Sequence, residues 1–272
     1  MSTQSIVLVT GGNTGIGYET IKALYASSEA YTILMGSRSL DKANAAVSAL
    51  INEVTESRSE IALLQIDIED DASIERAFEE VKSKYGRIDT LVNNAGGSFD
   101  QIAVDNPTPA GIREAWNRGY NLNTSSTQVV THVFAPLLLK SSSPRLLFVT
   151  SGLSSLTTCS GGANALTMSG VPQKGWPKPP AFTQTAYRSS KTALNMQMLE
   201  WKRILEVDGV KVFAISPGFL ATNLGGKGKE FLRKAGAGDA SKGGIFIKNV
   251  VEGKRDADVG KVIDDKDGVQ PW

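Results

Sequence analysis

Two side chains separated by four positions could perform proton transfer. Tyr187 and Lys191 stand at the two ends of the segment Tyr187-Arg188-Ser189-Ser190-Lys191, which opens a helix-like run. Residues at i and i+4 lie on one face of a helix, so the lysine ammonium could lower the pKa of the phenol. A tyrosine tuned in this way can donate a proton to a developing alkoxide, or accept one in the reverse reaction. The same spacing is common by chance, and an ordinary surface lysine would explain it equally well. The pair therefore indicates a catalytic site only together with other motifs.

Polar residues at the ends of other elements could complete such a site. Ser151 follows the apolar run 146–150, the NNAG segment 93–96 follows the preceding run, and Asn121 lies in the helix-like segment between them. Each of these would be an ordinary turn or cap residue if it occurred alone. Together they place hydroxyl and amide groups at the ends of neighbouring elements.

A glycine-rich turn lies between the first strand-like run and the first helix-like run. Its sequence is Thr10-Gly11-Gly12-Asn13-Thr14-Gly15-Ile16-Gly17, with the spacing G-x-x-x-G-x-G. Glycines there let the backbone approach a pyrophosphate, and a helix N-terminus supplies unpaired N–H donors and a positive dipole end. Glycines also serve in simple turns, but this position, where a strand–helix unit opens, favours a nucleotide site.

The end of the second strand indicates which nucleotide would bind. An NAD site would place Asp or Glu there to hold the ribose 2′-hydroxyl. The sequence has Ser37-Arg38-Ser39 instead, and a guanidinium with flanking hydroxyls can hold a 2′-phosphate. The alternative is a surface arginine that starts a helix. We expect NADP(H) as the cofactor.

The hydrophobic pattern predicts elements that would carry these residues on one sheet. Short β-branched runs alternate with longer amphipathic segments, which is typical of a parallel sheet covered by helices on both faces. We expect an α/β fold with a Rossmann-type, doubly wound parallel sheet of about seven strands, in a single domain over residues 1–272. The expected strands are 6–10, 31–35, 61–66, 90–93, 145–150, 210–216 and, more weakly, 261–264. The expected helices are 15–27, 40–56, 72–85, 111–139, 187–206 and 240–252.

Two long segments interrupt this alternation, and both follow strands. Segment 152–186 is rich in Ser, Thr, Gly and Pro, and segment 218–240 is rich in Gly. Loops of this length are more often functional than idle, and ligands bind at the carboxyl ends of such strands. We expect an insertion loop and a substrate lid, although the same apolar residues could simply pack these segments onto the body. The apolar side chains that could form a lid are Leu166, Met168, Val171, Trp176, Phe219, Leu220 and Leu224.

Composition excludes several other classes of protein. The net charge of 29 − 28 = +1 argues against a nucleic-acid binder. Cys159 is the only cysteine and His132 the only histidine, so neither a disulfide nor a Cys/His zinc cluster can form. His132 lies in an apolar helix-like run, where a structural histidine is more plausible than a hydrolase base. No signal peptide or membrane span is evident, so we expect a cytoplasmic protein without a membrane partner.

These motifs in this order resemble the one-domain short-chain dehydrogenase/reductase family, with matches from Thr10 to Thr222. The resemblance implies a tetrad of Asn121, Ser151, Tyr187 and Lys191. Tyr187 would be the acid/base, Ser151 would orient the carbonyl, Lys191 would bind the nicotinamide ribose, and Asn121 would hold a relay water.

The resemblance also implies a set of cofactor contacts. Asp67 and Ile68 would contact the adenine, and Asn94, Ala95 and Gly96 would line the adenosine side. The segment 216–222 would grip the nicotinamide end through Pro217, Gly218, Leu220 and Thr222. The remaining implied contacts come from the glycine turn, the end of the second strand and the tetrad: Gly11, Asn13, Thr14, Gly15, Ile16, Gly17, Ser37, Arg38, Tyr187 and Lys191.

The chain departs from the family pattern at three places. Between the serine and the tyrosine there are 187 − 151 = 36 positions, whereas the family usually has about a dozen. Insertions here resemble the carbonyl-reductase branch, whose members are often monomers, so we expect a monomer or a weak homo-oligomer. Thr124 stands where glycine commonly follows the tetrad asparagine, so Asn123 rivals Asn121. Thr14 stands where some NADP-preferring relatives carry a basic residue, which leaves Arg38 as the main phosphate anchor.

The expected function is reversible hydride transfer between NADPH and a ketone or aldehyde, with Tyr187 as general acid/base. A hydrophobic or aromatic carbonyl suits the lid, and Arg118 would also tolerate an anionic one. Two alternatives remain open: the same fold acting on an imine or enone, and a non-catalytic NADP-binding sensor or partner protein. The sensor would not need Ser151, Tyr187 and Lys191 together.

Overall fold

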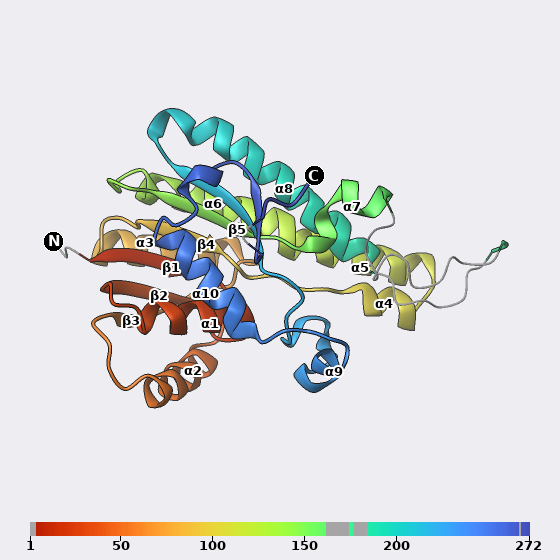
Figure 1. Ribbon diagram of the computed structural model, residues 1–272, viewed down its shortest axis with the longest axis horizontal. Helices are drawn as coiled ribbons and strands as arrows, with labels where there is room; N and C mark the ends of the chain where they lie inside the picture. Colours follow the sequence, from red (N-terminus) through yellow and green to blue (C-terminus); the bar gives the residue numbers. More distant parts are fainter. Residues whose placement is uncertain (1–3, 162–173, 177–183, 267) are drawn as a thin grey trace.

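Across the residues that the structure describes, seven strands form one parallel sheet. The computed structural model describes residues 4–161, 174–176, 184–266 and 268–272. The sheet has the order β3-β2-β1-β4-β5-β6-β7, so β1 pairs with both β2 and β4. This confirms the predicted doubly wound sheet (Figure 1). The strands are β1 (Ser5–Val9), β2 (Tyr31–Ser37), β3 (Glu60–Gln65), β4 (Thr90–Asn93), β5 (Arg145–Val149), β6 (Lys211–Ser216) and β7 (Val262–Asp264).

The helices follow the predicted segments, with one subdivision and several short additions. The helices are α1 (Gly15–Tyr25), α2 (Leu40–Glu53), α3 (Asp71–Lys84), α4 (Asp100–Asp105), α5 (Pro109–Tyr120), α6 (Ser126–Leu138), α7 (Leu156–Ser160), α8 (Thr185–Leu205), α9 (Lys229–Lys234) and α10 (Ala240–Val251). The predicted helix 111–139 is divided by a π-helical turn (Asn121–Ser125) between α5 and α6. Helices α4, α7 and α9 were not predicted because five or six residues are too few to show a helical period. In the described ranges, none of the helices combines the length and the apolar character that crossing a membrane requires.

Alternate side chains of the strands contribute to two separate cores. In β1, Ile6 and Leu8 belong to one cluster of buried apolar side chains, and Val7 and Val9 belong to another. The first cluster extends into α3, α6 and α8, and the second into α1, α2 and α10. Each face of the sheet is therefore covered by helices, which is why the middle of each strand is mostly apolar.

The two long segments contain more structure than a loop. Segment 152–186 begins with a 3-10 turn (Gly152–Ser154) and α7, and its last residues already belong to α8. Leu166, Met168 and Val171 lie outside the described residues, and Trp176 is 87% exposed. Segment 218–240 contains α9 and lies beyond the end of β6 (Figure 1).

Candidate active site

The carboxyl edge of the sheet gathers the residues that the motifs single out. The glycine turn follows β1, Arg38 follows β2, and Asp67 follows β3. Asn94 follows β4 and Ser151 follows β5. Parallel strands end at the same edge, so residues separated by many positions in the sequence meet there. Ligands of open α/β sheets bind at this edge, beside the point where the strand order reverses.

The glycine turn has a backbone that only glycine accommodates well. Gly11 and Gly15 have φ angles of +63° and +58°. A Cβ atom on Gly17 would lie 2.4 Å from the carbonyl oxygen of Gly11 and 2.5 Å from Asn94 Nδ2. Helix α1 starts at Gly15, and in the described structure its cap residue Thr14 makes no side-chain cap hydrogen bond. The turn and the first amides of α1 therefore form a cradle that suits a pyrophosphate.

The NNAG segment after β4 holds the glycine turn in place. Asn94 Nδ2 donates to the carbonyl oxygens of Thr10 at 2.8 Å and Gly11 at 3.3 Å. The Thr10 hydroxyl accepts hydrogen bonds from the amides of Asn94 and Ala95 at 3.0 and 3.1 Å. The turn is thus fixed from the neighbouring strand, which leaves its outer surface available for a ligand.

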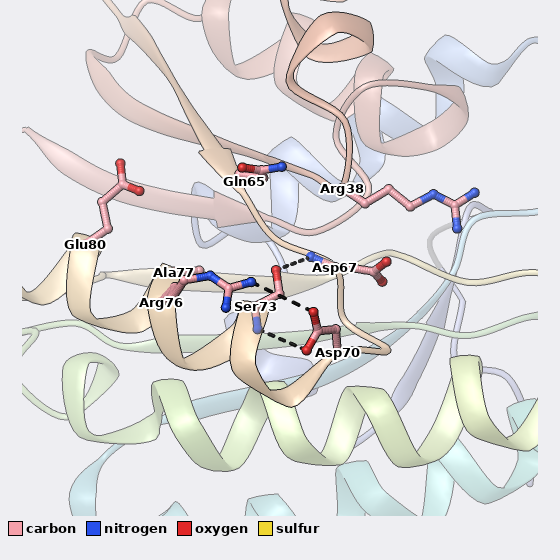
Figure 2. A pocket seen from close by; sticks show the side chains of 8 residues that line it. All are labelled: Arg38, Gln65, Asp67, Asp70, Ser73, Arg76, Ala77 and Glu80. Carbon is pink, nitrogen blue, oxygen red and sulfur yellow. Dashed lines mark hydrogen bonds and ion pairs between the residues drawn. The ribbon is translucent and has the colours of Figure 1, made fainter.

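A cavity of about 370 Å³ lies at the ends of β2 and β3. Figure 2 shows Arg38 and Asp67 extending from these strand ends in the same direction. The Asp67 amide donates to Ser73 Oγ at 3.0 Å, which ties β3 to the start of α3. The hydroxyl of buried Ser37 donates to the Ser39 carbonyl at 3.0 Å. Ile68 is buried. The Arg38 guanidinium is exposed at the end of β2, so it can bind an anionic ligand in this cavity.

A second cavity, of about 410 Å³, brings Lys42 to the glycine turn. It is lined by Asn13, Thr14, Lys42, Ala45 and Ala46. The sequence motifs did not single out Lys42, because it lies in the first turn of α2 and far from the turn in the sequence. The structure therefore supplies a cation beside Thr14, where the sequence lacks a basic residue.

Ser151, Tyr187 and Lys191 lie together, as the sequence predicts. The Ser151 hydroxyl lies close enough to the Tyr187 phenol to lower its pKa, and the phenol is buried. Lys191 Nζ donates to the carbonyl oxygen of Val149 at 2.8 Å and lies 6.0 Å from the centroid of the Tyr187 ring. One strand end and one helix face thus provide a hydroxyl, a phenol and an ammonium group.

Burial sets the protonation of this group in a way that the sequence did not predict. Burial raises the pKa of Tyr187 to about 12, the Ser151 hydrogen bond opposes that rise, and the charge of Asp100 adds to it. The net shift of the phenol pKa is therefore opposite to the lowering expected from Lys191, because the cost of burial is its largest cause. Burial also lowers the pKa of Lys191 to about 8, since the ammonium loses its hydration. At neutral pH the phenol holds its proton and is able to donate it.

The two asparagines of the π-helical turn point to different surroundings. Asn121 is exposed, and its Nδ2 donates to Glu69 at 2.8 Å. Asn123 is fully buried and donates to the Gly97 carbonyl and to Ser190 Oγ, both at 2.9 Å. A Cβ on Gly96 would lie 2.8 Å from Asn123 Oδ1 and 3.2 Å from Lys191 Nζ, so both groups border the same point. The structure brings Asn123 to Lys191 and binds the side chain of Asn121 elsewhere.

A buried polar network supports Ser151 from behind. Ser154 Oγ donates to the Ser151 carbonyl at 2.6 Å, and Asn195 Nδ2 donates to Ser154 Oγ at 2.9 Å. Gln270 Nε2 donates to the Ser151 carbonyl at 3.3 Å and to Ser154 Oγ at 3.2 Å. Asn195 was detectable, since it lies one further i+4 step beyond Tyr187 and Lys191. Gln270 had no signal, because it comes from the far end of the sequence.

The segment after β6 closes the site from the opposite side. A Cβ on Gly15 would lie 3.7 Å from Thr222 Cβ, so this segment packs on the glycine turn. Gly218 has a φ angle of +90°, and a Cβ there would lie 2.6 Å from Asp265 Oδ2. Leu220 is buried and bridges to Gly238, whereas Phe219 and Leu224 are 45% and 40% exposed. Two apolar side chains are thus accessible next to the candidate cofactor cradle.

Comparisons with known proteins identify relatives of this chain. Residues 5–163 match the family model described as short chain dehydrogenase. The chain is 47% identical over 275 residues to the short-chain dehydrogenase/reductase tropE of Talaromyces stipitatus, covering 100% of this chain and 99% of that protein. It is 45% identical to the short-chain dehydrogenase/reductase eupG of Phoma sp, covering 98% and 97%.

A solved structure shares the fold. It is the NADPH-bound carbonyl reductase from chicken fatty liver, with a TM-score of 0.76, 22% identity and complete coverage of both chains. At this identity the likeness concerns the fold, including the parallel sheet and the helices that cover it.

Proposed function

Because the chain belongs to the short-chain dehydrogenase/reductase family of oxidoreductases, we propose that it reduces a ketone or an aldehyde with NADPH in a reversible reaction. The observation that carries the proposal is the arrangement of Ser151, Tyr187 and Lys191 beside the glycine turn. A non-catalytic cofactor sensor would need the turn but not a buried phenol beside the Ser151 hydroxyl.

The residues of the chain would act on the carbonyl oxygen. NADPH, when bound, supplies the hydride. The hydroxyls of Ser151 and Tyr187 would hold the carbonyl oxygen, on which negative charge develops, and fixed donors of this kind stabilise a transition state. Tyr187 keeps its proton at neutral pH and gives it to the alkoxide. Lys191, held by the Val149 carbonyl, contributes positive charge next to this transfer.

Two cations support a preference for the phosphorylated cofactor. Arg38 lies at the end of β2, where an NAD-binding site would carry a carboxylate. Lys42 lines the cavity formed with Thr14 and Asn13, and its ammonium can bind a 2′-phosphate together with Arg38. Together they compensate for the absence of a basic residue at Thr14.

Asn123 takes the place of the family's asparagine in this proposal, instead of Asn121. Its burial and its position next to Lys191 support this choice. The sequence favoured Asn121 because a regular helix was expected there, whereas both asparagines lie in a π-helical turn. We expect an apolar substrate, since Phe219 and Leu224 are exposed apolar side chains that flank Thr222, which packs on the glycine turn. This segment forms one wall of the substrate site.

The test is loss of NADPH absorbance with a panel of ketones, aldehydes, imines and enones. Turnover with a ketone or aldehyde is expected, and Tyr187→Phe is expected to abolish it while NADPH binding, followed by fluorescence, stays within twofold of wild type. Tyr25→Phe, at the far end of α1, is the matched control and should keep full activity. Near-normal turnover in Tyr187→Phe would contradict the mechanism, and turnover confined to imines or enones would contradict the substrate class.

A further inference from the structure

A buried carboxylate lies at the start of the helix that carries Tyr187 and Lys191. Asp100 is the first residue of α4, and only 6% of its surface is exposed. Its Oδ1 accepts the Ala186 amide at 2.8 Å, and its Oδ2 accepts the Tyr187 amide at 3.1 Å. A buried carboxylate is costly unless it is fully hydrogen-bonded, so these contacts indicate a specific arrangement.

The contacts replace a cap that α8 lacks. In the described structure, its cap residue Gln184 makes no side-chain cap hydrogen bond. The first amides of a helix have no partner within the helix, and a carboxylate beside them also opposes the positive end of the dipole. Here the cap comes from 86 positions away in the sequence.

The same short segment contacts the glycine turn, Asn123 and the start of α8. Asn94 binds the glycine turn, and Gly97 exchanges two hydrogen bonds of 2.9 Å with Asn123. Asp100 then binds the first turn of α8 and also accepts a hydrogen bond from Ser98 Oγ at 3.2 Å. The segment 94–100 therefore joins the cofactor cradle to the proton donor through hydrogen bonds at both ends.

We propose that Asp100 is a positioning residue for Tyr187, whose carboxylate fixes the first turn of α8 and with it the place of the phenol. This inference rests on the proposed reductase function. Asp100 acts through the backbone and the field, without contact to the reacting atoms. Holding a reacting group in place accounts for large rate factors, and a displacement of about 1 Å can cost roughly 100-fold in rate.

The charge of Asp100 has a second effect, on the proton that Tyr187 donates. It raises the pKa of the phenol, in the same direction as burial. Among the described residues, Lys191 on the same helix lies 6.0 Å from the centroid of the Tyr187 ring, and Arg118 of α5 lies 4.4 Å from the ring centroid of Phe99, the neighbour of Asp100. Removing the carboxylate therefore lowers the pKa of Tyr187.

The test compares Asp100→Asn with Asp105→Asn. Asp105 lies on the same short helix, is exposed and, within the described part of the chain, accepts one hydrogen bond, from Gln101 Nε2, so it is a matched control. Asp100→Asn is expected to lower kcat for reduction about 10- to 100-fold, with the Kd for NADPH within about twofold of wild type. The rate of reduction falls as the phenol loses its proton, so the basic limb of the kcat profile should move to lower pH. Asp105→Asn should change neither quantity.

Amide hydrogen exchange provides a readout that needs no turnover. The amides of Ala186 and Tyr187 should exchange at least about tenfold faster in Asp100→Asn than in wild type. Ser98→Ala removes one hydrogen bond of the carboxylate and should speed this exchange about two- to threefold, which keeps the test available if Asp100→Asn does not fold.

The outcomes separate the two proposals. Wild-type kcat and an unmoved pH profile in Asp100→Asn would overturn the positioning role, whatever the loss of thermal stability. Unchanged exchange of both amides in the variants would overturn the cap itself. Absence of any carbonyl turnover in the wild-type protein, with exchange accelerated as expected, would count against the reductase function and not against the cap.

Discussion

Helices α1 and α8 both begin at the carboxyl edge of the sheet, but a carboxylate binds the first turn of α8 and none binds the first turn of α1 in the described structure. Neither cap residue, Thr14 or Gln184, makes a side-chain cap hydrogen bond in the described structure. The first turn of α1 contains no acidic residue and is surrounded by glycines. The first turn of α8 is bound by the buried carboxylate of Asp100.

The difference follows from what each helix end has to do. An uncapped helix end with a close backbone approach suits an anionic ligand, since the free amides and the dipole favour negative charge. A capped end suits a helix whose side chains must stay in place, since satisfied amides and a neutralised dipole hold the first turn. The missing side-chain cap thus leaves amides free for a ligand at α1, and at α8 it leaves amides for Asp100 to bind.

The largest effect is expected at Lys191, on the face that the capped end positions. Lys191→Met should lower kcat about 100- to 10,000-fold, as the loss of a group that assists proton transfer does. The same substitution should stabilise the fold at neutral pH. The pKa of Lys191 is about 8 in the folded protein against an ordinary value of 10.5, so unfolding takes up a proton between these pH values. Stability therefore rises with pH through that window, and below it the buried charge costs up to about 3 kcal/mol.

Urea unfolding measures that gain directly. Lys191→Met loses the hydrogen bond to Val149, so the expected net gain at neutral pH is about 1–2 kcal/mol. The gain should vanish near pH 10.5, where the lysine is neutral in both states. Lys202→Met, on the same helix and paired with Glu206, should leave the stability nearly unchanged. A variant of Lys191 that is less stable than wild type at neutral pH would contradict the burial argument.

The uncapped end can be obstructed by one methyl group. A Cβ on Gly17 would come within 2.4 Å of the Gly11 carbonyl, so Gly17→Ala has to displace the turn. NADPH affinity is expected to fall about 100-fold, consistent with an overpacking cost of about 1–3 kcal/mol. Gly119→Ala, where the nearest atoms lie 3.8 Å away, is the control and should bind NADPH normally. Fluorescence titration measures both, and unimpaired binding in Gly17→Ala would exclude this turn as the cradle.

The charge at the uncapped end should decide between the two nicotinamide cofactors. Arg38→Asp places a carboxylate where NAD sites carry one, so it should repel the 2′-phosphate and accept the 2′-hydroxyl. The ratio of kcat/KM for NADPH over NADH is expected to fall about 100-fold, and Lys42→Met should lower it about two- to tenfold. Arg76→Met is the control, because Arg76 lines the cavity beside Asp67 but faces Asp70 at 3.8 Å. An unchanged ratio in Arg38→Asp would contradict the assignment of the phosphate anchor.

How well the sequence predicted each residue depends on the range of the contacts that place it. The glycine turn and the Tyr187–Lys191 pair are local patterns, and the structure puts both where the spacing indicated. Asn121 and Asn123 differ by two positions inside a π-helical turn, whose wider winding changes which side chain faces inward. A helical period of 3.6 cannot detect such a turn, so the sequence could not decide between them.

The sequence motifs could not predict residues whose contacts lie far away in the sequence. Asp100 binds amides 86 and 87 positions away, and Gln270 binds a carbonyl 119 positions away. Neither stands at a recognisable spacing from Tyr187 or Ser151. The direction of the phenol pKa shift also differs from the expected lowering, because the cost of burial depends on the packing of the whole site and not on one neighbouring lysine.

The smallest effect is expected behind Ser151, where the position of the hydroxyl depends on the end of the chain. Gln270 Nε2 binds the Ser151 carbonyl and Ser154 Oγ, so Gln270→Ala leaves both with one donor fewer. Loss of one such hydrogen bond costs about 0.5–1.5 kcal/mol, and kcat should fall about two- to tenfold with KM for NADPH unchanged. Trp272→Ala is the matched control, because Trp272 contacts Thr157 and Ser155 through its main-chain oxygen, which the substitution keeps. Equal kcat values for the two variants would show that Ser151 is held by Ser154 and Asn195 alone. A lower kcat in Gln270→Ala only would show that supporting contacts from a distant part of the chain matter at the serine as they do at the start of α8.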